Sequence, residues 1–190
     1  MANKKICILS TVHPPFDVRI FHKEAVTLVN AGYEVLLIAQ HDKAEIVDGV
    51  KIINLKTPVN RMARMTKTVW SAFRKALKTD AVLYHIHDPE LMPIGFLLKC
   101  LGKKVIYDMH ENLPKQIRNK AWINPRSRYL VSRLICFAER LFLRNIPIIF
   151  AEISYHKDYL WVKNYETILN LPVLSRFAYV DNSAIEKNKF

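Results

Sequence analysis

Short runs of consecutive hydrophobic residues alternate along this chain with segments whose hydrophobic positions recur every three or four residues. Runs of the first kind are typical of strands buried in a parallel sheet, and segments of the second kind are typical of amphipathic helices. The predicted strands cover residues 5–10, 33–39, 49–55, 81–86, 104–107, 146–151 and 166–169. Their alternation with helices predicts an α/β fold with a parallel sheet of about seven strands and helices on both faces.

Start and stop signals mark the helices between these strands. A helix near residues 20–31 ends at Gly32, because glycine readily adopts the left-handed conformation that closes a helix. Another begins at Asn124-Pro125 and runs to about Asn145, since Asn is a favoured N-cap and Pro a favoured first helical residue. The run at 49–55 alternates hydrophobic with polar residues, which predicts an edge strand.

The same pattern predicts the domain organisation. Residues 1–170 are expected to form a single Rossmann-like domain, a length that supports one full core. Residues 171–190 break the alternation, with Pro172 and the polar triplet 181–183, and are expected to begin an interdomain linker or tail.

Cysteine usage and hydropathy predict a cytoplasmic location for the chain. Cys7, Cys100 and Cys136 are scattered and flanked by apolar residues, which indicates reduced thiols rather than disulfides or zinc ligands. No uninterrupted apolar stretch approaches the roughly 20 residues that a membrane-spanning helix needs.

The net charge of +12 is concentrated in two segments. Residues 56–78 hold seven basic side chains and no acidic one, and residues 112–150 hold eight basic side chains against Glu139 alone. Such local patches indicate an anionic partner surface. Nucleic acid is not the expected partner, because the sequence has no stacking platform and no known reading motif.

The second basic segment has a pattern typical of a membrane-surface helix. Four arginines fall within about 40° of one another on a helix of 100° per residue, namely Arg126, Arg133, Arg140 and Arg144. Leu130, Phe137 and Leu141 flank them. A basic stripe beside apolar groups suits an anionic membrane, which predicts a peripheral location on the inner face of the cell membrane. The alternative is a solvated charged face whose apolar groups pack under a neighbour.

Histidine and acidic residues follow three of the predicted strands. His13, Asp17 and Arg19 follow the first, residues 87–90 the fourth, and residues 108–111 the fifth. The carboxyl ends of parallel strands lie at one edge of a sheet, where ligands bind in open α/β sheets. We therefore expect the three clusters to meet along that edge.

Each of these residues also has a structural interpretation. Asp88-Pro89 is a typical helix start with Asp as N-cap, and His85 is expected deeper in the core than His87, which lies nearer the rim. His110, between Asp108 and Glu111, could donate to a substrate hydroxyl or phosphate, or serve only the core.

A metal-dependent hydrolase is the main alternative function. His-x-His-Asp and Asp-x-His-Glu together offer a ligand inventory for a divalent cation, made of His85, His87, Asp88, Asp108 and His110. The spacing is not specific to a metal site, so we assign no metal ligand.

Four segments together resemble the N-terminal half of a family 4 glycosyltransferase. They are HPPFDVRIFHKE at 13–24, GYEVLLIA at 32–39, YHIHDPELMPIG at 84–95 and GKKVIYDMHE at 102–111, and ILNLP at 168–172 resembles the point where such chains leave that half. The resemblance implies a GT-B architecture, in which an N-terminal domain receives the acceptor and a C-terminal domain holds most of the sugar-nucleotide. It also implies transfer of a sugar to a lipid-linked or cell-surface glycan, with no cofactor besides the nucleotide-sugar substrate.

The resemblance assigns roles by motif position. His110 matches the family histidine beside the donor sugar, and is the expected catalytic residue. The acceptor and donor cleft is expected to contain Asp17, Arg19, His87, Asp88, Glu90 and Glu111. Residues 14–16 are Pro-Pro-Phe where many members have a glycine pair, and we expect the C-terminal domain to be absent from this chain. We therefore expect no transfer by this chain alone, because the departing diphosphate needs the other wall of the cleft, on the same polypeptide or a separate donor-binding subunit.

Overall fold

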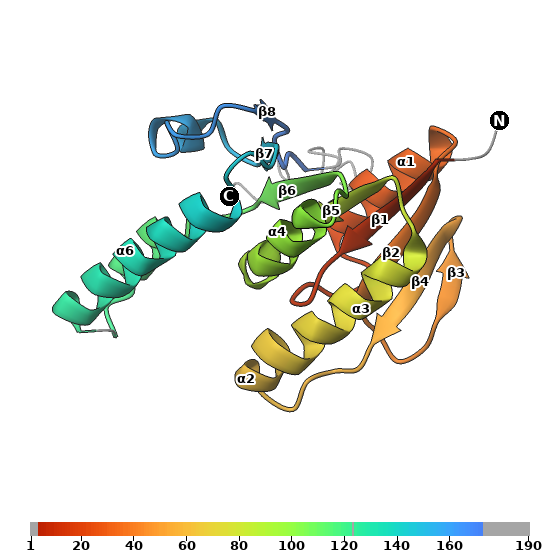
Figure 1. Cartoon of the computed structure of the whole chain (residues 1–190), viewed down its shortest axis with the longest axis horizontal. Helices are drawn as coiled ribbons and strands as arrows, with labels where there is room; N and C mark the ends of the chain where they lie inside the picture. Colours follow the sequence, from red (N-terminus) through yellow and green to blue (C-terminus); the bar gives the residue numbers. More distant parts are fainter. Residues whose placement is uncertain (1–3, 123, 173–190) are drawn as a thin grey trace, which may run out of the picture.

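One mostly parallel sheet organises the protein, as seen in a computed structural model that describes residues 4–122 and 124–172 (Figure 1). The strands are β1 (Lys5–Leu9), β2 (Glu34–Gln40), β3 (Glu45–Val47), β4 (Val50–Leu55), β5 (Leu83–Ile86), β6 (Val105–Met109), β7 (Ile148–Phe150) and β8 (Tyr165–Thr167). Their order is β3-β4-β2-β1-β5-β6-β7-β8. Neighbours are parallel except β3, which is antiparallel to β4. The predicted α/β fold is confirmed.

The sheet has one strand more than predicted, and its edge is different. β3 has three residues, too few to give a hydrophobic period, so the sequence did not reveal it. It pairs with β4, and the prediction that residues 49–55 form an edge strand is therefore wrong. Of the predicted tail at 171–190, residues 173–190 lie outside the described part of the chain.

Helical segments connect the strands. They are η1 (Val18–Ala25), α1 (Val26–Asn30), α2 (Arg61–Ala63), η2 (Arg64–Thr68), α3 (Val69–Thr79), η3 (Pro89–Leu91), α4 (Met92–Cys100), α5 (Leu113–Asn119), α6 (Pro125–Phe142) and η4 (Ile153–Lys157). Gly32 follows α1 with a φ of 86°, as its predicted role requires. Asn124 caps α6 by accepting a hydrogen bond from the Arg126 N–H at 3.0 Å.

The core lies on both faces of the sheet. Alternate residues of β1 point to opposite faces, so Cys7 belongs to one hydrophobic cluster and Ile8 to the other. The first cluster includes residues of α3 and α4, such as Phe73, and the second includes residues of η1, such as Phe21. The predicted two-sided cover is confirmed, and η1 is thereby fixed beside the carboxyl ends of the strands.

Candidate functional site

The three predicted polar clusters meet at one edge of the sheet. β1, β5 and β6 are neighbours and parallel, so their carboxyl ends lie side by side. Asp88 after β5 bonds to the loop after β1, and His87 contacts His110 after β6. The expectation that sequence-distant residues converge here is confirmed, because parallel pairing brings the strand ends together.

Asp88 holds the loop that follows β1. Its Oδ2 accepts hydrogen bonds from the backbone N–H groups of Thr11 at 2.5 Å and Val12 at 3.1 Å, and its Oδ1 lies 2.9 Å from His13 Nδ1. Asp88 occupies the N-cap position of η3, but its side chain makes no cap bond, so the predicted capping role is wrong. The carboxylate faces the β1 loop, where more N–H donors point at it.

The contact between Asp88 and His13 shifts the pKa of both side chains. Burial acts to raise the pKa of Asp88, but the hydrogen bonds from His13 and the Thr11 N–H outweigh it, and the pKa lies below its usual value. The hydrogen bond to Asp88 raises the pKa of His13, against the opposing effect of burial. An imidazolium–carboxylate pair is therefore favoured at this edge.

Arg19 joins two carboxylates, of buried Asp108 and half-buried Glu24, instead of facing a ligand. Its Nε lies 3.0 Å from Asp108 Oδ2 and 3.0 Å from Glu24 Oε1, and its Nη2 lies 2.8 Å from Asp108 Oδ2. The side chain is 4% exposed. Asp17 accepts from the N–H groups of Arg19 at 2.8 Å and Ile20 at 3.0 Å, and so caps η1. In this structure both residues, predicted to line the cleft, stabilise the fold.

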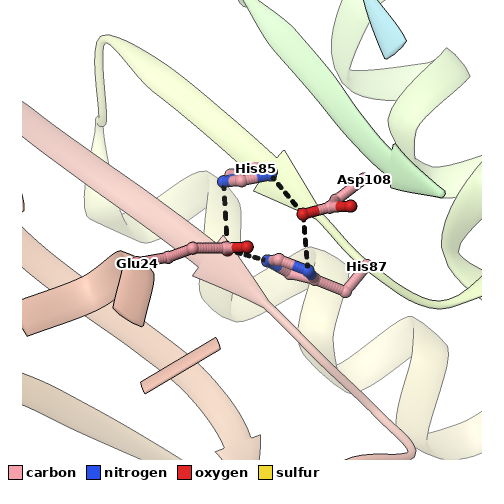
Figure 2. A group of neighbouring side chains, drawn as sticks. All are labelled: Glu24, His85, His87 and Asp108. Atoms are coloured by element: carbon pink, nitrogen blue, oxygen red, sulfur yellow. Dashed lines mark ion pairs between the residues drawn. The ribbon is translucent and has the colours of Figure 1, made fainter. Parts of the chain in front are cut away.

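His85 and His87 lie beside those carboxylates, as Figure 2 shows. Their rings are 4.4 Å apart between centroids, and they share one face of the strand as expected. His87 is 1% exposed and His85 7%, so the prediction that His87 lies nearer the rim is wrong. The reason is that Glu24 of η1 and His110 cover His87: its Nε2 is 3.4 Å from Glu24 Oε2, and its Nδ1 is 2.9 Å from His110 Nε2.

Burial is the main cause of the pKa shifts of His85, His87 and Glu24. It lowers the pKa of His85 to about 4 and that of His87 well below the usual value, so both imidazoles are neutral. It raises the pKa of Glu24 to about 10. Among the described residues, three buried side-chain atoms have no hydrogen-bond partner: Glu24 Oε2, His85 Nε2 and His87 Nε2.

His110 is the half-buried histidine that bounds this group on the solvent side, with a side chain 16% exposed. Its ring is fixed by His87, and its backbone carbonyl accepts a hydrogen bond from the Tyr155 hydroxyl at 2.9 Å. Burial lowers the pKa of His110, so the ring is neutral near pH 7. A neutral imidazole with one nitrogen engaged by His87 can offer the other to a hydroxyl or phosphate.

A cleft of about 470 Å³ lies at the same edge, over the ends of β2 and β4. Its lining includes Arg61 and Arg64. Glu90, predicted as a cleft residue, accepts from Arg64 Nε at 3.0 Å and from the Thr11 hydroxyl at 2.8 Å, which ties the cleft wall to the β1 loop. Glu111 is exposed. His110 does not line this cleft.

The predicted basic stripe is exposed, with three of its arginines on α6 and the fourth two residues after the helix ends at Phe142. Arg126, Arg133, Arg140 and Arg144 are all exposed. The apolar residues among them are exposed too, with Phe137 65%, Leu130 60% and Leu134 58% accessible. They do not pack under a neighbour within the described residues, and Figure 1 shows α6 extending away from the sheet. In the part of the chain that the structure describes, no helix is long and apolar enough to cross a membrane.

The five residues predicted as metal ligands for the alternative hydrolase function do not come together at one site. Asp88 faces the β1 loop and His110 lies outside the buried group, whereas Glu24 enters it. The group Glu24, His85, His87 and Asp108 is largely enclosed, which gives a substrate no access to it. No observation here favours hydrolysis.

Glu24 and Tyr155 are contact residues that the sequence did not single out. η1 is π-helical, with the Val26 N–H donating to the Phe21 carbonyl, and in such a turn residues five apart, such as Arg19 and Glu24, face the same way. The 3.6-residue period places those two residues on different faces, so no helical pattern would have found Glu24.

Solved structures share this fold, whereas no family model matches the chain and no curated protein matches its sequence. The chain is similar to sucrose-phosphate synthase from Thermosynechococcus elongatus, with a TM-score of 0.69 and 16% identity over 98% of this chain and 53% of that one. A second structure of that enzyme matches with a TM-score of 0.58 and 16% sequence identity, over 90% of this chain and 90% of that one.

A UGT transferase from Siraitia grosvenorii in complex with UDP is also similar, with a TM-score of 0.56 and 9% identity over 97% of this chain and 52% of that one. Identity this low establishes a shared fold. The chain has the α/β fold found within these glycosyltransferases, and it spans about half the length of the full synthase chain and of the Siraitia chain.

Proposed function

We propose that this chain is the acceptor-binding half of a cytoplasmic glycosyltransferase that moves a sugar from a nucleotide-sugar to a lipid-linked or cell-surface glycan. The observation that carries the proposal is His110, a neutral, positioned imidazole at the carboxyl ends of the strands, in a fold shared with glycosyltransferases. The motifs at 13–24, 84–95 and 102–111, which resemble family 4 enzymes, contribute the residues at that edge.

In this proposal His110 contacts the donor sugar or the attacking hydroxyl, and the cleft beside Arg61 and Arg64 receives the acceptor. A guanidinium pair suits a phosphate-bearing acceptor, because guanidinium forks match phosphate oxygens. Turnover needs a second Rossmann-like domain facing this edge, since preorganised donors must stabilise the departing diphosphate. That the chain spans 53% of the sucrose-phosphate synthase chain supports this requirement.

The test is sugar transfer from labelled nucleotide-sugars to a lipid-linked acceptor, by the chain alone and by the chain together with a donor-binding domain. We expect transfer only in the second case. His110→Ala should reduce kcat/KM by about 100-fold or more, the usual range for a positioned acid–base group. His156→Ala is the matched control, because His156 is also half-buried but bonds to Thr167 at the end of β8. An unimpaired His110→Ala enzyme would remove His110 from the site.

We also propose that α6 rests on an anionic membrane surface near the acceptor. The support is the exposed mixture of Arg126, Arg133 and Arg140 with large apolar side chains on one face of α6, and exposed Arg144 just beyond the end of the helix. Each basic residue near an anionic leaflet contributes about 1 kcal/mol, so four give reversible attachment. Liposome flotation checks it: recovery should require anionic lipid and fall when all four arginines become Ala. Equal recovery on neutral and anionic vesicles would contradict the proposal.

A further inference from the structure

Glu24, His85, His87 and Asp108 form a buried four-residue cluster, drawn in Figure 2, that is built from metal-ligand side chains. One ligand atom from each lies within 4.8 Å of the others. The cluster contains the three partnerless buried atoms, Glu24 Oε2, His85 Nε2 and His87 Nε2. A buried polar atom without a hydrogen-bond partner costs about 1–3 kcal/mol of folding free energy. Three such atoms in one place indicate that a bound group other than the protein itself interacts with them.

We propose that this cluster binds one divalent cation, with Zn²⁺ as the first candidate. Two imidazoles with two carboxylates form a donor set that borderline cations accept, whereas Mg²⁺ and Ca²⁺ prefer oxygen ligands alone. Zn²⁺ bonds of about 2.0–2.2 Å place tetrahedral ligand atoms roughly 3.3–3.6 Å apart. His87 Nε2 lies 3.4 Å from Glu24 Oε2, and His85 Nε2 lies 3.8 Å from Asp108 Oδ2.

The charge of the site leaves room for a cation. Arg19 is the guanidinium that contacts the cluster, and it faces two carboxylates. Its bonds go to Glu24 Oε1 and to Asp108, so Glu24 Oε2 remains on the side of the histidines. A metal ion needs ionised carboxylates and neutral imidazoles as ligands, so the proton that burial keeps on Glu24 would be released when a cation binds. Glu24 and Asp108 together would then exceed the charge of Arg19 by one. A bound cation balances that excess more fully than Arg19 alone can.

The cation would also act on His110, through His87. Histidine bound to a metal by one nitrogen typically donates its other N–H to a neighbour, which fixes both rings. His87 bound through Nε2 would carry its proton on Nδ1 and donate it to His110 Nε2 across the observed 2.9 Å. His110 would then present an Nδ1–H group, a donor, toward a ligand. His87 is in this respect a positioning residue.

Metal content and spectroscopy test the proposal directly. The chain, with exposed Cys100 replaced by Ser to prevent capture at a thiol, is purified from Zn²⁺-supplemented medium and measured by elemental analysis. We expect about one Zn²⁺ per chain. After removal by a chelator, titration with Co²⁺ should give the visible absorption of a four-coordinate site and saturate at one equivalent.

Glu24→Gln keeps the side-chain volume and removes the ligand charge. Loss of a hydrogen-bond partner of a ligand weakens metal binding about 10–100-fold, so loss of the ligand itself should weaken it by about 100-fold or more. Glu45→Gln is the matched control, because Glu45 pairs with His41 Nε2 at 2.6 Å on the surface. Circular dichroism of both variants checks that they fold.

The proposal would be overturned if the wild-type chain contained far less than one metal ion per chain and gave no Co²⁺ absorption spectrum. The cluster would then be held together only by hydrogen bonds and protons shared among its side chains. Metal retained by Glu24→Gln and lost by Glu45→Gln would overturn it too, by placing the ion at the surface pair. These results are separate from those for sugar transfer. A chain that transfers sugar together with a donor-binding domain but binds no cation would contradict the cation proposal alone. A chain that binds one cation but gives no transfer together with such a domain would contradict the glycosyltransferase proposal alone.

Discussion

Arg19 is the side chain on which the buried charge of this edge depends. It lies 3.0 Å from Glu24 and 2.8 Å from Asp108, and it donates to the Ile168 carbonyl at 3.1 Å. One guanidinium therefore connects η1, β6 and the segment after β8. The sequence suggested a ligand contact for Arg19, because a stiff polar loop suits one. The distances show that its donors are used within the fold.

Arg19→Met should be strongly destabilising. Removing one partner of a buried ion pair leaves an uncompensated carboxylate, which costs about 3–5 kcal/mol of unfolding free energy. Arg74→Met is the matched control, because Arg74 is exposed on α3, and we expect a change within about 0.5 kcal/mol there. Urea unfolding followed by circular dichroism measures both, and equal stabilities would contradict the structural role of Arg19.

Glu139 makes the stability depend on pH. Burial raises its pKa from 4.5 to about 7, against the hydrogen bond that the Tyr159 hydroxyl donates to it. The folded chain thus keeps a proton that the unfolded chain releases, and stability falls as the pH rises from about 4.5 to about 7. At about 1.4 kcal/mol per pKa unit, the loss of unfolding free energy over this pH range reaches roughly 3 kcal/mol.

Glu139→Gln, a neutral residue of the same shape, should remove this loss. We expect the variant to be more stable than the wild type at pH 8, by up to about 3 kcal/mol, and close to it at pH 4.5. Melting temperatures at the two pH values measure the difference. Glu166→Gln, on exposed β8, should leave the pH profile unchanged. A pH profile shared by the wild type and Glu139→Gln would mean that Glu139 is ionised in the fold.

At the scale of elements, η1 decides which side chains reach the strand ends. Its π-helical turns place Glu24 beside Arg19 and over His87. Propensities and hydrophobic period predict a helix near residues 20–31, and that much is confirmed by η1 and α1. They do not predict the wider turn, because a π-helix forms where packing against neighbours compensates its poorer backbone geometry.

Close packing of α4 on the sheet gives an element-scale prediction. A Cβ added at Gly95 would lie 2.5 Å from Cδ1 of Ile86, the fully buried last residue of β5. Gly95→Ala should therefore destabilise the fold by about 1–3 kcal/mol, less a few tenths gained from helix propensity. Ile86→Val removes that methyl, so the double variant should recover stability relative to Gly95→Ala. Additive losses in urea unfolding would contradict the close approach.

At the scale of the whole molecule, two surfaces have different chemistry. The strand-end edge combines His110 with the arginine-lined cleft, and α6 carries exposed arginines and apolar side chains. The net charge of +12 is therefore not spread evenly but concentrated where we propose anionic partners. A glycosyltransferase half that approaches a lipid-linked acceptor at a membrane would need both surfaces.

Attachment to anionic vesicles should depend on salt. The Debye length falls from about 10 Å at 0.1 M to about 3 Å at 1 M salt, which screens exposed arginines. We expect flotation with anionic vesicles to fall several-fold over that range. Phe137→Ser should weaken the residual binding at high salt, because that binding depends on the exposed apolar groups of α6. Binding that is equal at both salt concentrations would exclude the arginine stripe as its main cause.

The sequence by itself determined the order of elements, the caps at Asn124 and Gly32, and the meeting of three polar clusters at one edge. These follow from local period, from cap chemistry and from the rule that parallel strands end together. The tertiary structure alone decided that Asp88 serves the β1 loop, that His87 lies deeper than His85, and that Glu24 joins them. Such contacts join residues 77 positions apart, as between Thr11 and Asp88, and depend on loop conformation and on the turn of η1, which no local pattern encodes.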